Sequence, residues 1–176
     1  EGAIGAVRFV SITLCKPATE DPDNPPWRVM PEVSGGGHFF DLASHQLDYL
    51  DYLLGPIASA SGHTRNQAGL YAAEDAVAAS FAFESGVLGN GTWSFAADRR
   101  QDRIELIGDK GHIAFSTFDF TPVELTRATG TEAFDYPAPE HVQQPLVQTI
   151  VNTLLNRGEC PSTGTSAART SRIIDL

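Results

Sequence analysis

SGGGHFFDLASHQLDYLDYLLG, residues 34–55, carries the clearest structural pattern in the chain. From Phe39 to Leu54 the apolar residues recur with the period of an amphipathic helix, and the following Gly55-Pro56 is a typical helix end. On a helical wheel one face collects Leu42, Ala43, Leu47, Leu50, Leu53 and Leu54. We therefore predict a helix over 39–54 whose leucine-rich face packs on the protein core.

The opposite face of this predicted helix carries a narrow polar stripe. Asp41, His45, Asp48 and Tyr52 fall within about 60° of one another on the wheel. A solvated helix face is usually rich in charged residues of both signs, yet residues 39–64 contain no lysine or arginine. Two carboxylates that flank a histidine, with a tyrosine on the same line, indicate a candidate site.

The spacing within the stripe suits acid–base chemistry. Side chains four residues apart are neighbours on a helix, so the Asp41 carboxylate can accept a hydrogen bond from one ring nitrogen of His45. Such a bond fixes the tautomer and leaves the other nitrogen free as a general base or acid. Other readings stay open: Asp41 as a helix-capping acid, His45 and Asp48 as solvated surface groups, or a metal held by all three.

The rest of the chain predicts a sheet and two further helices. Hairpin turns are indicated at Glu84-Ser85-Gly86 and at Gly108-Asp109-Lys110-Gly111, and residues 27–33 are expected to be extended. The expected strands span 4–14, 57–65, 76–83, 87–95, 103–107, 112–118, 123–126 and 134–136, and the expected helices span 142–156 and 165–176. This order predicts an α+β fold with a large, mostly antiparallel β-sheet and helices packed on one face.

The strand over 76–83, AVAASFAF, has small or apolar residues on both of its faces. A sheet that is apolar on both faces must cover both. Because the helices cover one face, we expect a second copy of the chain on the other, in a homo-oligomer. The first strand starts almost at residue 1 and the last helix lacks a C-cap signal. Residues 1–176 are therefore expected to be a single domain of a longer chain.

Composition narrows the range of partners. The chain has 12 basic and 22 acidic residues and a net charge of −10. An acidic chain repels phosphate backbones, so no nucleic-acid partner is expected. No apolar run suits a transmembrane helix, and the first residues do not resemble a signal peptide. Cys15 and Cys160 are expected to be free thiols in a reducing compartment, which indicates a cytoplasmic protein without a membrane partner.

Residues 34–55 resemble the signature of the Gfo/Idh/MocA family of NAD(P)-dependent sugar and cyclitol dehydrogenases. In that signature a glycine run leads to an aspartate, then a histidine, then a second aspartate, then a leucine-rich end closed by glycine. The matching positions here are Gly35, Gly36, Gly37, Asp41, His45, Asp48 and Gly55. Ala43 departs from it, since glycine is common there. The first strand, Trp27-Arg28 and the hairpin at 108–111 fit the same family in order.

The resemblance implies the C-terminal, substrate-binding half of such an enzyme, with a fold like the C-terminal domain of dihydrodipicolinate reductase. The other half would be a Rossmann domain that binds NAD or NADP, and its glycine-rich turn is absent from this sequence. His45 would accept or relay the proton of a secondary alcohol on a sugar or an inositol-like cyclitol, with Asp41 orienting its ring. The residues expected to border this substrate are Asp48, Arg28, Trp27 and Tyr52, with His38 as a further contributor.

The family's lysine, in a Glu-Lys-Pro motif, belongs to the absent half, so Cys15-Lys16-Pro17 is not given that role. Without the cofactor-binding half, the chain alone is expected to be inactive. The isolated histidines His63, His112 and His141 are expected to be surface or capping residues. Two other functions stay open. The same helix could serve NAD-assisted cleavage of a glycoside, or the chain could be a non-catalytic dimerisation or ligand-binding module.

Overall fold

A computed structural model describes residues 2–176. The strands are β1 (Val7–Cys15), β2 (Ile57–Arg65), β3 (Ala76–Phe83), β4 (Leu88–Ser94), β5 (Gln101–Gly108), β6 (Gly111–Phe115), β7 (Val123–Arg127) and β8 (Gly130–Phe134). The helices are the 3-10 turn η1 (Trp27–Val29), α1 (Pro31–Ser34), α2 (His38–Leu54), α3 (Gln144–Leu154) and α4 (Gly164–Ile174).

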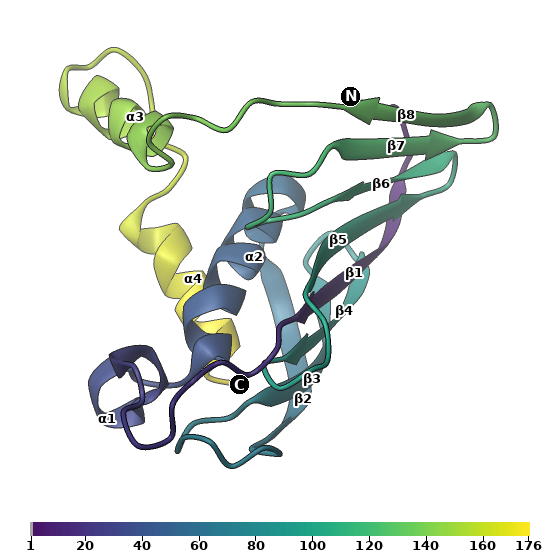
Figure 1. The fold of residues 1–176 in the computed structure, drawn as a ribbon. Coiled ribbons are helices and arrows are strands. Elements are labelled where there is room, and N and C mark those ends of the chain that lie inside the picture. Colours follow the sequence, from purple (N-terminus) through teal and green to yellow (C-terminus); the bar gives the residue numbers. More distant parts are fainter. Residues whose placement is uncertain (1) are drawn as a thin grey trace.

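All the strands belong to one mixed sheet in the order β2-β3-β4-β1-β5-β6-β7-β8. Only β1 and β4 run parallel to each other; every other neighbouring pair is antiparallel. The helices lie on one side of this sheet, with α2 across it and α4 outside α2 (Figure 1). The predicted fold class, a large and mostly antiparallel sheet with helices on one face, is confirmed.

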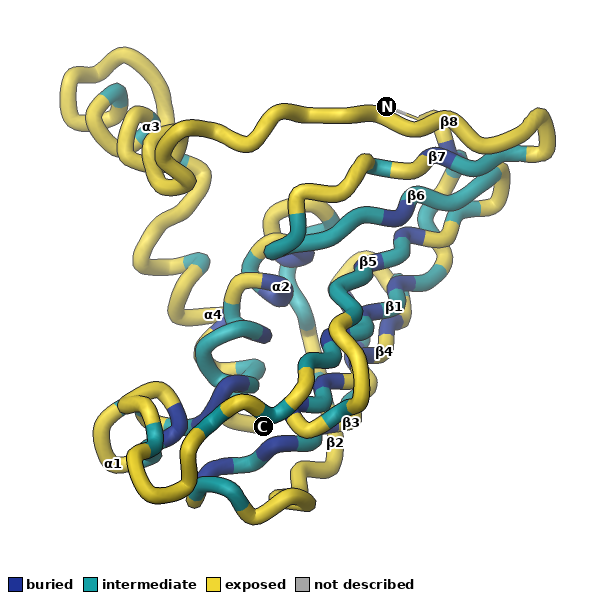
Figure 2. Tube along the Cα trace, in the orientation of Figure 1, coloured by how far each residue is buried: buried dark blue, intermediate teal, exposed yellow. Residues whose placement is uncertain are grey.

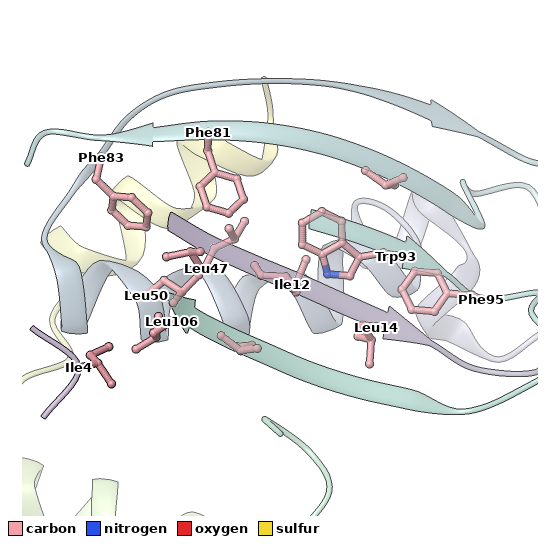
Figure 3. Packing of buried hydrophobic residues seen from close by; sticks show 14 of the residues in the cluster. Ile4, Ile12, Leu14, Leu47, Leu50, Phe81, Phe83, Trp93, Phe95 and Leu106 are labelled. Atoms are coloured by element: carbon pink, nitrogen blue, oxygen red, sulfur yellow. The ribbon is translucent and has the colours of Figure 1, made fainter. Parts of the chain in front are cut away.

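Helix α2 carries the polar stripe that the sequence predicts. It spans His38–Leu54 and is followed by Gly55, whose φ of 87° is one that glycine adopts without strain. Its core face buries Ala43, Leu47 and Leu50 as predicted, and Figure 3 shows Leu47 and Leu50 among the aromatic side chains of the sheet. The position predicted for Leu53 is wrong: its side chain is 41% exposed because it borders an open apolar cavity of about 440 Å³ between α2 and β5–β7.

Two other elements differ from the prediction. Residues 27–33, expected to be extended, form η1 and most of α1 instead. Pro31 occupies the first turn of α1, where its missing N–H group has no intrahelical partner to lose, and Gly35 ends the helix with a φ of 83°. The last strand lies at Gly130–Phe134 rather than at 134–136, because it folds back on β7 at the turn before Gly130.

One face of the sheet and helix α3 are uncovered. On β2–β4 the residues that alternate with the core are exposed. Most are small or polar, namely Ser61, Ala78, Ser80, Asn90 and Thr92, and the apolar Leu88 is 55% exposed on the same face. Helix α3 contains no buried residue and stands away from the sheet (Figure 2).

Cys15 and Cys160 are free thiols, as predicted. Within residues 2–176 there is no helix with the length and apolar character needed to cross a bilayer.

Two glycines of β4 make room for aromatic rings on its buried face. A Cβ atom at Gly91 would overlap the Trp93 indole, and one at Gly89 would overlap the Phe81 ring. We therefore expect Gly91→Ala to destabilise the domain by about 1–3 kcal/mol through overpacking. Denaturant unfolding measures this, with the exposed neighbour Asn90→Ala as the control. Equal stability of the two variants would show that the indole does not need the glycine.

Candidate active site

Helix α2 turns the predicted polar stripe away from the sheet. His45 and Tyr52 are exposed, whereas Asp41 and Asp48 are partly buried. The helix places these side chains on one line, as the wheel predicts. Within residues 2–176, however, Asp41 makes no hydrogen bond with His45. The four residues of the stripe therefore lie in different local environments.

Asp41 pairs with Arg28 instead of with His45. The Arg28 Nε donates to the Asp41 carboxylate at 3.1 Å, and its guanidinium lies over the Trp27 ring at 4.6 Å from the ring centroid. These three residues border a cavity of about 260 Å³ between η1, the start of α2 and the end of α4. The pair is about half exposed, so it contributes little to stability. It does bring together Trp27, Arg28 and Asp41, which the sequence analysis proposed as site residues.

His45 lies one turn further along α2, at a second cavity of about 370 Å³. Asp48, Tyr49 and Tyr52 line it from α2, and the far wall comes from the loop before α4 and from α4 itself. Across the part of the chain that the structure describes, no hydrogen bond engages either imidazole nitrogen of His45. The closest aromatic neighbour is Phe118, in an edge-to-face arrangement with ring centroids 5.9 Å apart. The imidazole can therefore exchange a proton with a group that enters this cavity.

Asp48 is tied to helix α4. Its carboxylate accepts a hydrogen bond from the Thr170 hydroxyl at 3.2 Å. One turn later Asp51, which is 7% exposed, accepts from the Arg169 Nε at 3.0 Å. Both contacts hold α4 against α2, so Asp48 has a structural partner as well as a place in the cavity wall. The Asp51–Arg169 pair was not predicted from the sequence, although a third acid in a helix without lysine or arginine indicates that a cation comes from another segment.

A second group of polar residues lies buried at the start of α2. The Glu20 carboxylate accepts from the Lys16 Nζ and from the His38 Nε2, both at 2.7 Å, and these two nitrogens lie 3.1 Å apart. The side chains of Glu20 and His38 are only 5% and 8% exposed. His38, expected near the substrate, instead lies inside this cluster, with its ring against Phe95 and Tyr71. Sequence reasoning gave Lys16 no role and did not single out Glu20.

The surroundings of this cluster lower the pKa values of Glu20 and His38. Burial alone raises the pKa of Glu20, but hydrogen bonds from Lys16, from the Thr19 amide and from His38 outweigh it and lower the pKa to about 2. For His38, burial lowers the pKa below its ordinary value, and this effect exceeds the opposite effect of the Glu20 hydrogen bond. At neutral pH the cluster therefore consists of an ammonium, a carboxylate and a neutral imidazole.

We expect acid to destabilise the domain through this cluster. A lowered pKa means that the unfolded state binds protons more readily, so stability falls as the pH falls. His38 acts first, below about pH 6.5. Glu20 acts between its usual value of 4.5 and about 2. Melting temperatures recorded from neutral to acidic pH should fall in this order. A Glu20→Gln variant that keeps the full slope below the usual carboxylate pKa would contradict the assignment.

Residues 2–176 contain no group of three or more His, Cys, Asp or Glu side chains arranged to hold a metal ion. Of the isolated histidines, His63 is exposed on β2 and His141 is exposed in the loop before α3. His112 lies 3.9 Å from the Glu105 carboxylate on the neighbouring strand.

Comparisons with known proteins identify the fold. Residues 1–114 match the family model of the GFO/IDH/MocA C-terminal domain. Oxidoreductase P35 of Formosa agariphila is 32% identical over 152 residues, which is 85% of this chain and 46% of that protein. Levoglucosan dehydrogenase in complex with NADH and levoglucosan superposes with a TM-score of 0.84 at 19% identity, over 99% of this chain and 56% of that one.

An oxidoreductase from Agrobacterium radiobacter, in complex with NAD+, L-tartaric acid and magnesium, superposes with a TM-score of 0.80 at 19% identity. That match covers 99% of this chain and 54% of the other. At these identities the solved structures show a shared fold. This chain spans about half the length of the relatives that it matches.

Proposed function

The chain belongs to the GFO/IDH/MocA family of oxidoreductases, in which it matches the C-terminal domain, and we propose that it is the substrate-binding half of a nicotinamide-dependent dehydrogenase. Its substrate is a secondary alcohol of a sugar or an inositol-like cyclitol. His45 accepts or relays the hydroxyl proton. The observation that carries this proposal is the exposed His45 imidazole, without a protein hydrogen-bond partner in the described chain, at the wall of a cavity of about 370 Å³.

The residues of this chain fit the substrate side of the reaction and not the cofactor side. A dinucleotide site needs a glycine-rich turn between a strand and a helix, so that backbone N–H groups meet the phosphates. Here Gly35–Gly37 join two helices, and Gly89 and Gly91 lie inside β4 against aromatic rings. We propose that NAD or NADP is held mainly by another part of a longer protein, and that when bound it accepts the hydride of the alcohol.

The chain's own residues handle the proton and hold the substrate. A neutral imidazole that accepts the hydroxyl proton raises the electron density on the alcohol oxygen, and this favours loss of hydride from the same carbon. Asp48 and Tyr52 provide polar atoms in the same cavity wall. Arg28, Trp27 and Asp41 border the neighbouring cavity of about 260 Å³, one helical turn away, where an aromatic face and a charged pair suit a hydroxylated ring.

The relatives support the substrate class. Levoglucosan dehydrogenase binds NADH and levoglucosan, and the Agrobacterium radiobacter oxidoreductase binds NAD+ and L-tartaric acid. In each case a nicotinamide dinucleotide accompanies a small hydroxylated compound. We extend this pairing to the present chain as part of the proposal.

The test is a direct spectrophotometric assay with the full-length protein. Each of a panel of sugars, anhydrosugars and cyclitols is incubated with NAD+ or NADP+, and the reduced cofactor is measured by its absorbance. We expect reduction with at least one polyol, and none with the chain of residues 1–176 alone. Absence of any net reduction, together with release of sugar from glycosides, would favour NAD-assisted cleavage over dehydrogenation.

We further propose that the protein is a homo-oligomer whose subunits meet through the uncovered sheet face. Exposed small side chains such as Ala78, Ser80 and Asn90 leave this face flat enough for another sheet. Placing a long charged side chain at its centre, in Ser80→Arg, is expected to reduce the mass measured by light scattering to that of a monomer. An oligomer of unchanged mass in this variant would place the interface elsewhere.

A further inference from the structure

Behind His45, a buried polar chain crosses from helix α2 to the sheet. The next residue, Gln46, is fully buried. Its Oε1 accepts from the Trp93 Nε1 at 2.7 Å, and its Nε2 donates to the Asp102 Oδ1 at 3.4 Å and to the Thr117 Oγ1 at 3.5 Å. A buried amide has to satisfy both its oxygen and its nitrogen. Gln46 does so with partners on two strands and on the segment after β6.

This polar chain ends at the Asp102 carboxylate, which binds backbone amides of the segment after β6. The Asp102 Oδ2 accepts from the amides of Phe118 and Asp119, at 2.5 and 3.2 Å. Asp119 in turn pairs with the Arg100 guanidinium, whose Nε lies 2.9 Å from its Oδ1. Residues 116–119, which follow β6, are therefore held by two contacts. Asp102 binds their backbone amides, and Arg100 binds the Asp119 side chain.

This fixed segment carries the aromatic ring that meets His45. The Phe118 ring packs edge-to-face against the imidazole, with centroids 5.9 Å apart and ring planes at 86°. The carboxylate expected to orient His45, that of Asp41, is paired with Arg28 instead. The Phe118 ring is therefore a packing contact that restricts how the imidazole can turn.

We propose that Asp102, Gln46 and Phe118 are positioning residues for His45. Gln46 ties the helix position next to His45 to Asp102, and Asp102 fixes the segment that presents Phe118. Through these contacts the sheet sets the orientation of the imidazole, and no carboxylate on the same helix does so. This inference rests on the proposed role of His45 in proton transfer, and the contacts that it invokes can be tested without turnover.

The first test is spectroscopic and uses the intact protein labelled with ¹³C at the histidine Cε1 atoms. The His45 resonance is assigned by its loss in His45→Gln. Phe118→Leu keeps an apolar side chain but removes the aromatic ring, so we expect a change in the His45 Hε1 shift. Asp102→Asn is expected to move the same resonance, because in either orientation its amide NH₂ faces one donor: the backbone N–H groups or the Gln46 amide.

The control is Asp98→Asn, which removes the same charge from an exposed position near the start of β5. It should leave the His45 resonance in place. A His45 resonance that is unchanged in Phe118→Leu overturns the proposal, and this variant alone decides the matter if Asp102→Asn does not fold. Movement of the resonance in Asp98→Asn to the same extent would also overturn it, since the effect would then be one of charge.

The second test is kinetic. A misplaced acid–base group slows the chemical step more than it weakens binding, so Asp102→Asn and Phe118→Leu should lower kcat by about 10-fold to 100-fold with a smaller change in KM. A loss confined to KM would overturn the positioning role. If instead His45→Gln itself retains full activity, the proposed function fails while the spectroscopic result on the contact still stands.

Discussion

Replacing His45 by glutamine in the full-length protein is expected to lower kcat/KM for alcohol oxidation by about 10²–10⁴-fold. This is the usual contribution of a placed acid–base group. Glutamine keeps a polar side chain of similar length but cannot accept and release a proton near neutral pH. Because His45 has no hydrogen-bond partner in the described chain and stands at a cavity wall, the substitution should leave the melting temperature almost unchanged.

The matched control is His141→Gln, which makes the same change at an exposed loop position away from α2. Its kcat/KM should equal that of the unmodified protein. Steady-state rates with the best substrate of the panel, together with thermal melts, separate the two outcomes. A near-normal rate in His45→Gln would remove this residue from the proposed mechanism.

Replacing Glu20 by alanine is expected to destabilise the domain by about 3–5 kcal/mol, the cost of leaving a buried charge without its partner. The variant leaves the Lys16 ammonium and the His38 imidazole 3.1 Å apart with no carboxylate between them. The loop from Pro17 to Pro26 would also lose its contact with the start of α2. Denaturant unfolding at neutral pH measures the effect.

Asp23→Ala is the control for this prediction, since it removes an exposed acid from the same loop. It should change the free energy of unfolding by less than about 0.5 kcal/mol. A double variant in which Lys16 and Glu20 both become methionine should be more stable than Glu20→Ala, because apolar groups need no buried partner. Equal effects of Glu20→Ala and Asp23→Ala would show that the buried cluster does not stabilise the fold.

Sequence periodicity predicted the parts of the fold that depend on local pattern. The helix over 39–54 is correct to one residue at its start, and both hairpins lie where glycine-containing turns indicated them. The stripe on α2 follows directly from helical geometry, so its four residues do share one side. The same pattern could not show that Leu53 faces an open cavity, because that depends on how closely β5–β7 approach the end of the helix.

The partners of the stripe could not be predicted, because they come from segments distant in sequence. Arg28 reaches Asp41 only because residues 27–34 fold into two short helices, and Thr170 reaches Asp48 only because α4 returns to α2. Lys16, Glu20 and His38 meet where the end of β1, a proline-rich loop and a helix start converge. Local spacing shows which side chains share a face, and tertiary contacts decide which of them remain free for chemistry.

The most direct measurement is a crystal structure of the full-length protein with an oxidised nicotinamide cofactor and a polyol that it oxidises. We expect the reacting hydroxyl oxygen to lie about 2.6–3.2 Å from a ring nitrogen of His45, within hydrogen-bond reach. A polyol bound away from α2, with His45 facing solvent or another copy of the chain, would contradict it.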